Sequence, residues 1–245
     1  MAPFIGKLPL LTLGLSLPGL SAQNLLVAAA SDLAPAQAAL KDGFHKAKGG
    51  GISMTLGSSG MLAAQIREGA PYDVYLSANE RFVEDLAASG HILRDSVRLY
   101  ATGRLGLWSK DRSIRTVAEL AARGVRHVAI ANPRHAPYGM AAEEALKAQG
   151  LWDALEPKLV FGENVRQAFE FAASGNAEAT ITSWTLVHDK GGILVPDAWH
   201  KPVLQAGGIV RESRRQDSAR RFLDFLTGPE GREILSRYGL FPPAR

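Results

Sequence analysis

Short apolar segments recur along the chain and alternate with stretches in which apolar residues follow helical periodicity. Strand candidates lie at residues 25–30, 52–56, 74–76, 105–108, 128–131, 159–161 and 179–181. After most of them, apolar residues recur every three or four positions, as at Leu33, Leu40 and Phe44 or at Val165, Ala168 and Ala172. Strands that alternate with helices are typical of α/β proteins. The pattern therefore predicts an α/β fold.

Capping residues and glycines mark the ends of the predicted helices. A Ser or Asn directly precedes four of the periodic stretches: Ser31, Ser59, Asn79 and Asn164. Glycines suited to the left-handed conformation after a helix follow others: Gly90, Gly150 and Gly175. Two further helices are predicted near the C-terminus, at 218–226 and 229–238, the second opened by Pro229 and stopped by Gly239.

The first 22 residues have the features of a secretory signal peptide. Lys7 supplies a positive charge, residues 8–20 are apolar, and Ala22 is a small residue at the expected cleavage position. A membrane anchor is the alternative, but the apolar stretch is shorter than the roughly 20 residues that span a bilayer and contains Pro9 and Pro18. We therefore expect cleavage after Ala22 and a periplasmic location.

Composition narrows the class of protein further. A chain of 245 residues suits two domains, and 46% hydrophobic with 21% charged residues is typical of a globular protein. The chain has no Cys, which excludes disulfides, thiolate metal sites and cysteine nucleophiles. Its formal net charge of +4 is spread along the sequence, so a nucleic-acid partner is not expected.

Four junctions between a strand and a helix carry small or uncharged residues, at 28–32, 57–60, 137–139 and 163–165. Ligands of open α/β sheets bind beyond the carboxyl ends of the strands. The unpaired N–H groups and the positive dipole end at a helix start favour anions there. The junctions therefore predict an oxyanion site that needs no cationic side chain. At each of them, a Ser or Asn that merely caps its helix is the competing interpretation.

Signs of catalysis are weak by comparison. The segment 57–60 does not match G-x-S-x-G, and the six His are scattered without an H-x-x-x-H pair. A catalytic triad and a dedicated metal site are therefore disfavoured. We expect Asp32 to favour its helix N-terminus electrostatically and Asp73 to make structural hydrogen bonds.

Taken together, these residues resemble the molybdate-binding proteins of ABC importers, which are type II periplasmic binding proteins. The similarity runs nearly end to end and rests on ordered motifs: VAAASDL at 27–33, LGSSGMLAAQI at 56–66, GAPYDVYLSA at 69–78, NPRHAPYG at 132–139 and GENVR at 162–166.

The resemblance implies two lobes, with residues 23–101 plus 205–245 in lobe I and 102–204 in lobe II. Two crossing strands, near 100–102 and 204–209, would join them, and the oxyanion would lie in the cleft between. The family's ligand contacts carry over as the hydroxyl and N–H of Ser31 and Ser59 and the backbone N–H of Tyr138 and Val165. Ser183 stands where the best-known members have a tyrosine.

The implied function is high-affinity binding of molybdate, and of tungstate, for delivery to the membrane permease of an ABC importer. The metal would be held only as part of the oxyanion, with no direct ligand from the protein, no cofactor and no catalysis, by a monomer. One alternative is a carrier of sulfate or another oxyanion with the same fold. A secreted serine hydrolase that uses Ser59 is the other.

Overall fold

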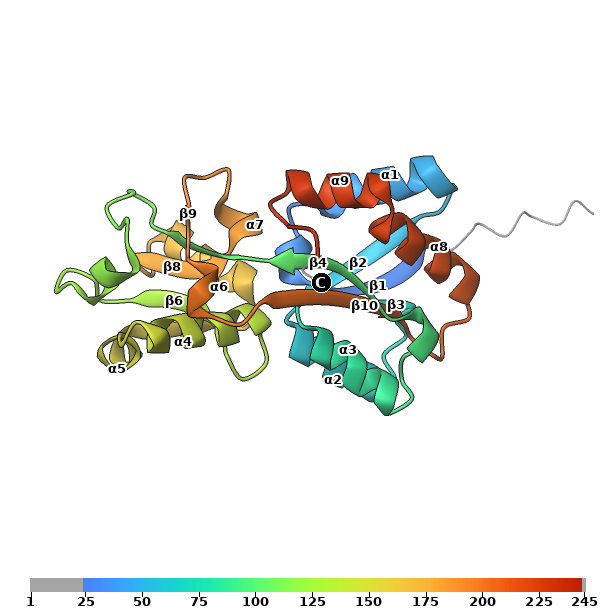
Figure 1. The fold of residues 1–245 in the computed structure, drawn as a ribbon, viewed down its shortest axis with the longest axis horizontal. Coiled ribbons are helices and arrows are strands. Elements are labelled where there is room, and N and C mark those ends of the chain that lie inside the picture. Colours follow the sequence, from blue (N-terminus) through green and yellow to red (C-terminus); the bar gives the residue numbers. More distant parts are fainter. Residues whose placement is uncertain (1–23, 244–245) are drawn as a thin grey trace, which may run out of the picture.

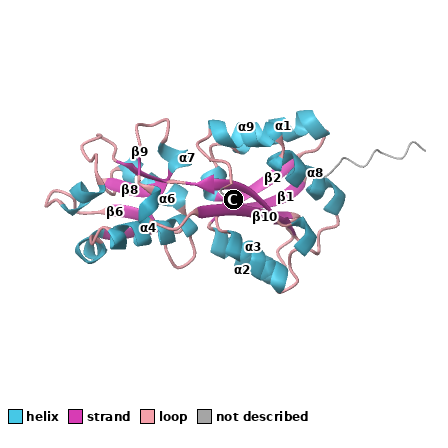
Figure 2. Cartoon of the chain, viewed as in Figure 1, coloured by secondary structure: helices cyan, strands magenta, loops and turns pink. Residues whose placement is uncertain are grey.

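Two five-stranded sheets, one in each of two lobes, form the framework of the computed structural model, which describes residues 24–243 (Figure 1). Helices flank both sheets (Figure 2). The expected signal peptide at 1–22 lies outside the described residues. No helix in the described part of the chain is long and apolar enough to cross a membrane.

The sheet of lobe I has the strand order β2-β1-β3-β10-β4. Its first three strands are parallel, whereas β10 runs antiparallel to both of its neighbours, β3 and β4. The bounds are β1 Leu25–Ala30, β2 Ile52–Gly57, β3 Val74–Ser77, β4 Arg98–Gly103 and β10 Val203–Ile209. Buried apolar residues on both faces explain the near-continuous apolar runs of the central strands.

Within residues 24–243, helices cover both faces of this sheet. On one face lie α1 (Gln37–Lys48), α8 (Gln216–Thr227) and α9 (Pro229–Arg237), and on the other lie α2 (Ser59–Arg67) and α3 (Glu80–Ala88) (Figure 1). The first face is closed by aromatic packing, with the rings of Phe44 and Phe222 edge to face at 5.2 Å. Leu62, Ile66 and Leu86 bury the apolar sides of α2 and α3.

The sheet of lobe II has the order β7-β6-β8-β5-β9, in which β6 is parallel to β7 and β8, and β5 is antiparallel to β8 and β9. Its strands are β5 Leu105–Trp108, β6 Val128–Ala131, β7 Leu159–Gly162, β8 Ala179–Ser183 and β9 Ile193–Leu194. Its helices are α4 Pro137–Ala148, α5 Trp152–Leu155, α6 Val165–Ser174 and α7 Trp184–Val187. Short 3₁₀ turns complete the molecule: Ser31–Leu33, Arg94–Ser96, Val117–Ala121, Glu156–Lys158 and Asp197–Trp199.

The chain passes between the lobes twice, from β4 directly into β5 and back through residues 195–202 into β10 (Figure 1). The C-terminal segment lies against the first connection, where Phe241 and Thr102 exchange backbone hydrogen bonds of 2.8 and 3.0 Å. The expected lobe boundaries, at 101/102 and 204/205, fall inside β4 and β10, and both strands pair in the sheet of lobe I.

All seven predicted strands are present, and Asn79 and Asn164 cap their helices with their side chains. The helix predicted to follow Ser31 is different. A 3₁₀ turn comes first, and α1 begins only at Gln37. Pro35 explains the interruption, because it has no N–H to donate to the carbonyl one turn earlier.

Candidate anion-binding site

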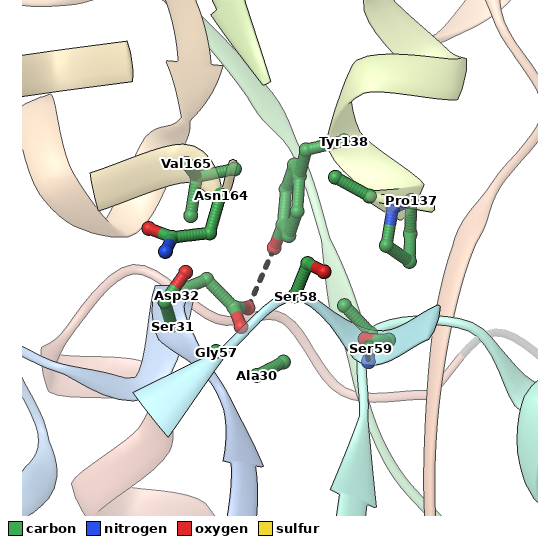
Figure 3. A pocket seen from close by; sticks show the side chains of 12 residues that line it. Ala30, Ser31, Asp32, Gly57, Ser58, Ser59, Pro137, Tyr138, Asn164 and Val165 are labelled. Atoms are coloured by element: carbon green, nitrogen blue, oxygen red, sulfur yellow. Dashed lines mark hydrogen bonds between the residues drawn. The ribbon is translucent and has the colours of Figure 1, made fainter. Parts of the chain in front are cut away.

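A small cavity lies between the lobes where the four predicted junctions converge (Figure 3). Lobe I contributes the ends of β1 and β2, and lobe II contributes the starts of α4 and α6. The empty space between the lining residues measures about 190 Å³, including the part that is open to solvent. The lobes therefore stand close together, and the cavity suits a ligand of few atoms.

Two serines of lobe I offer hydroxyl donors to this cavity. Ser31 directly follows β1, and its hydroxyl makes no hydrogen bond to any described residue, although the residue is only 3% exposed. Ser59 is the first residue of α2, and its Oγ accepts a hydrogen bond of 3.0 Å from the Ala78 N–H. Because the oxygen is used as an acceptor, the single hydroxyl proton of Ser59 stays available for a ligand.

Lobe II contributes backbone donors. Tyr138 and Val165 lie in the first turns of α4 and α6, where N–H groups have no partner within the helix. The Asn164 side chain accepts from the N–H groups of Arg166 and Gln167, at 3.0 and 3.2 Å. The Asn164 side chain therefore does not use the Val165 N–H, and this N–H bonds to no other described residue. It is available to a ligand, as expected for Val165 from the sequence.

The electrostatics of the cavity come from helix starts rather than from cationic side chains. No Lys, Arg or His is among the described residues that line it. Three helices, α2, α4 and α6, begin at its wall and direct the positive ends of their dipoles toward it. Such a site can hold an anion through neutral donors alone.

Ser183 does not line this cavity. It is fully buried at the end of β8, where its hydroxyl pairs with the Thr185 hydroxyl at 2.8 Å and accepts from the Thr185 N–H at 3.3 Å. The structure thus brings four of the five expected contact residues together and leaves this one aside. A direct contact between Ser183 and the anion stays a prediction.

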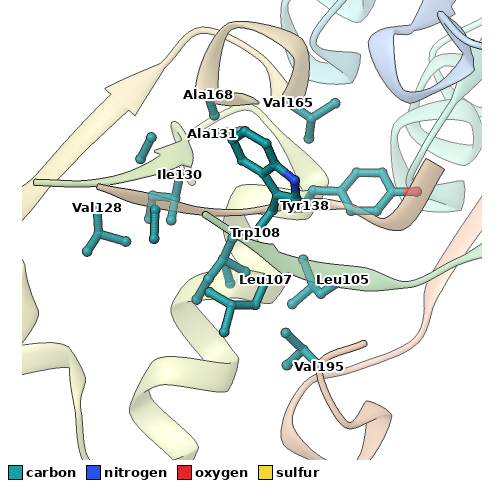
Figure 4. Close-up of a cluster of buried hydrophobic side chains, with 14 of the residues drawn as sticks. Leu105, Leu107, Trp108, Val128, Ile130, Ala131, Tyr138, Val165, Ala168 and Val195 are labelled. Carbon is teal, nitrogen blue, oxygen red and sulfur yellow. The ribbon is translucent and has the colours of Figure 1, made fainter. Parts of the chain in front are cut away.

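A buried hydrogen-bond network joins the lobes beside the cavity. The Tyr138 hydroxyl of α4 donates to Asp32 Oδ2 at 2.8 Å (Figure 3). Gln205 of β10 donates to the same oxygen at 2.5 Å. The Tyr138 ring lies at the edge of the lobe II core with its hydroxyl directed away from it (Figure 4). The Thr185 hydroxyl of lobe II also donates to the Asp32 carbonyl, at 2.7 Å.

Burial raises the pKa of the Asp32 carboxyl from its usual 3.8 to about 6, although its hydrogen bonds from Gln205 and Tyr138 oppose the shift. The pKa of the Tyr138 phenol is raised well above its ordinary value, first by burial and then by the charge of Asp32. Sequence reasoning assigned Asp32 to its helix start and missed this network. The available signal was Gln205, a polar residue inside the apolar strand at 203–209.

A second contact between the lobes was also missed. The Gly60 N–H of α2 donates to the His135 carbonyl at 2.9 Å, and the Ser58 hydroxyl pairs with His135 Nδ1 at 2.9 Å. A side chain at position 60 would not fit here, since an added Cβ would lie 2.8 Å from that carbonyl oxygen. Gly60 therefore permits the close approach of the lobes.

Known proteins share both the sequence and the architecture. The chain is 36% identical over 235 residues to the molybdate-binding protein ModA of Rhodobacter capsulatus, with 94% of this chain and 92% of the relative covered. The solved periplasmic molybdate-binding protein of Azotobacter vinelandii superposes with a TM-score of 0.86 at 32% identity, over 90% of this chain and all of that one.

A more distant structure shares the fold alone. The sulfate-binding protein SubI of Mycobacterium tuberculosis has a TM-score of 0.72 at 14% identity, over 89% of this chain and 86% of that chain. The fold is that of the type II periplasmic binding proteins, as the sequence predicts. The model of the family described as bacterial extracellular solute-binding protein matches residues 25–241, and the chain belongs to this family.

Proposed function

We propose that this protein binds molybdate, and tungstate with it, between its lobes and delivers the anion to the membrane permease of an ABC importer. The observation that carries the proposal is the convergence of four uncharged strand-to-helix junctions, two from each lobe, on one small cavity. The relatives that share most of the sequence are named for molybdate binding, which supports the same ligand.

The donors favour a fully deprotonated tetrahedral oxyanion. Such an anion accepts hydrogen bonds at every oxygen and has no proton of its own. A protonated phosphate would direct its own O–H at the donors of Ser31, Ser59, Tyr138 and Val165, so phosphate is disfavoured. Sulfate has the same charge and shape as molybdate, and only its shorter bonds distinguish it. A cavity set to the larger anion would leave sulfate with longer, weaker hydrogen bonds.

The rest of the assignment follows from this role. A binding protein that presents its cargo to a permease works outside the cytoplasm, in agreement with the signal peptide expected at 1–22 and with the description of the family. It needs no cofactor, and the metal of the cargo touches the protein only through its oxygens. We propose that it acts as a monomer.

A hydrolase is the second candidate because the structure does contain a Ser–His pair. It involves Ser58 rather than Ser59, with 2.9 Å between Oγ and His135 Nδ1. No carboxylate of the described residues is hydrogen-bonded to His135, so the third group that orients the base in a triad is missing. We therefore expect no ester hydrolysis, and turnover that Ser58→Ala or Ser59→Ala abolishes would assign the protein to enzymes instead.

Thermal unfolding with a panel of anions tests the proposal. A ligand that binds only the folded protein stabilises it by RT ln(1 + [L]/Kd), about 2.7 kcal/mol at a hundredfold excess over Kd. Molybdate and tungstate should each raise the melting temperature clearly, while sulfate and phosphate at equal concentration should do little. A sulfate shift as large as the molybdate shift would reassign the protein to a sulfate carrier.

A further inference from the structure

We infer that Asp32 is a proton-linked residue of the binding reaction: when the lobes close over the anion, Asp32 takes up one proton, so that the protein binds its oxyanion together with H⁺. The inference rests on the proposed function. It assigns Asp32 a positioning role between the lobes, through Tyr138 and Gln205, in addition to its place on the cavity wall.

The surroundings of Asp32 are unfavourable for a carboxylate. The residue is 1% exposed, and no ion pair or hydrogen bond of the described residues joins it to Lys, Arg or His. Oδ1 is buried without a hydrogen-bond partner. A buried charge that lacks both a counter-ion and part of its hydrogen bonds is costly, and protonation removes that charge.

The network can accommodate the added proton. Gln205 Oε1 is a second buried atom without a partner, whereas Gln205 Nε2 donates to Asp32 Oδ2 at 2.5 Å and to the Tyr138 hydroxyl at 2.9 Å. A half-turn of the amide would exchange the two atoms, giving up the bond to Tyr138 and placing Oε1 beside Asp32 Oδ2. The separation of 2.5 Å from Asp32 Oδ2 is short for N–H···O and falls within the range of O–H···O bonds. A proton on Oδ2 would then be donated to Gln205, while Oδ2 still accepts from the Tyr138 hydroxyl.

The anion strengthens the effect. Asp32 and Ser31 line the same cavity, so a dianion held there places negative charge beside the carboxyl group. A like charge within a few ångströms disfavours ionisation. The pKa of Asp32, already raised to about 6 by burial, should therefore rise further in the complex.

Opening the lobes reverses these conditions. Tyr138 and Thr185 belong to lobe II and Asp32 to lobe I, so separation breaks their hydrogen bonds and admits water to the carboxyl group. In the open form the pKa should return toward 3.8. Since the closed form has the higher pKa, closure takes up a proton and becomes more favourable as pH falls. Between the two pKa values, the affinity for the anion should decrease about tenfold for each unit by which the pH rises.

The other titratable groups around the site can be separated by mutation. The phenols of Tyr100 and Tyr138 face Asp32, and the charge of Asp32 helps to hold their pKa values well above the ordinary range. They stay protonated at neutral pH. Glu163, Arg166 and Glu170 are exposed and line a neighbouring pocket together with Ser31. His135, bonded to Ser58, is a further titratable group at the edge of the cavity itself. The variant His135→Gln is therefore the matched control for Asp32→Asn.

Calorimetric titration of sodium molybdate in buffers of different ionisation enthalpy measures the protons taken up. We expect the wild type to take up about half a proton or more per anion near pH 6, with less uptake toward pH 8. Asp32→Asn, whose amide replaces the neutral acid, should bind with no uptake and with an affinity independent of pH. His135→Gln should take up as many protons as the wild type, even though the loss of its bond to Ser58 weakens closure and lowers the affinity. Protonation of the ligand itself would contribute equally in all three proteins and so cancels.

Heat that does not depend on the buffer in the wild type overturns the inference, whether or not the variants fold. Uptake that persists in Asp32→Asn and disappears in His135→Gln also overturns it and assigns the proton to His135. Phosphate binding that Asp32→Asn abolishes would show that an ionised Asp32 accepts a hydrogen bond from the O–H of a protonated ligand, the opposite of the inference. Absence of any heat with molybdate and tungstate in the folded wild type is a different result, because it contradicts the proposed function itself.

Discussion

At the scale of single residues, the hydrogen-bond donors of the cavity are of two kinds, side-chain hydroxyls and backbone N–H groups. Ser31 and Ser59 offer hydroxyls that no described residue uses up as donors. Tyr138 and Val165 offer N–H groups that side-chain mutation leaves in place. Side-chain mutation can therefore remove the hydroxyl donors of lobe I, whereas the backbone donors of both lobes remain.

Ser31→Ala and Ser59→Ala should each weaken molybdate binding by about 1.5–3 kcal/mol, the range for hydrogen bonds to charged groups. This corresponds to a loss of roughly tenfold to a hundredfold or more in Kd, measured by calorimetry on folded protein. Ser183→Ala should cost less, since its hydroxyl is engaged by Thr185.

The exposed Ser89→Ala, at the far end of α3, is the matched control and should bind like the wild type. Neither cavity serine caps its helix with its side chain, so the stability of the ligand-free protein reports folding separately. Wild-type affinity in Ser59→Ala would show that the site has been misplaced.

Tyr138→Phe separates the backbone donor from the phenol. The sequence alone predicts little change, because only the main chain of Tyr138 is expected to contact the anion. The structure revises this expectation, since the hydroxyl joins the lobes through Asp32. Loss of one hydrogen bond to a neutral acid costs about 0.5–1.5 kcal/mol, so binding should weaken about threefold to tenfold. Calorimetry near pH 6 would measure it, and an unchanged Kd would argue that the network forms equally well without the hydroxyl.

At the scale of elements, α2 and the loop before α4 determine how closely the lobes approach. Gly60→Ala should leave the ligand-free protein as stable as the wild type or slightly more so, because Ala favours a helix by up to about 1 kcal/mol. Its methyl group would nevertheless meet the His135 carbonyl on closure, so molybdate affinity should fall.

Gly124→Ala serves as the control, because a methyl group there meets nothing within 4 Å. Melting temperature and calorimetric Kd together test the prediction. A loss of stability without a loss of affinity would contradict it.

The elements were more predictable than the contacts between them. Strand periodicity and the caps Asn79 and Asn164 are local signals, and the structure confirms them. Pro35 is also a local signal. Its effect on the start of α1 depends, however, on which carbonyl one turn earlier loses an N–H donor. The hydrogen bond between Asp32 and Tyr138 joins residues that are 106 positions apart. The periodicity of apolar residues along the sequence does not predict such a contact. The four junctions could be predicted because three of them are starts of α-helices and the fourth opens a 3₁₀ turn. Their convergence on one cavity required the resemblance to a family.

At the scale of the whole molecule, two chain connections join the lobes, and only a small cavity lies between them. This arrangement corresponds to a nearly closed form of a two-lobed binding protein. Small-angle scattering should give a smaller radius of gyration with molybdate than without it, because hinge closure brings the lobes together. Gly60→Ala should show less contraction at the same ligand concentration. An unchanged scattering profile at saturating molybdate would contradict closure by rigid lobes.

The position of β10 also has a consequence for the order in which the chain can fold. This strand lies between β3 and β4 in the sheet of lobe I, yet in sequence it follows all of lobe II. Lobe II is continuous in sequence, and its last strand ends at residue 194. The N-terminal segment of lobe I is synthesised earlier, but β3 and β4 are joined only once residues 203–209 have been added. Contacts that close such long loops form slowly. A chain still emerging from the ribosome therefore holds an unfinished lobe I sheet until residues 203–209 have been synthesised.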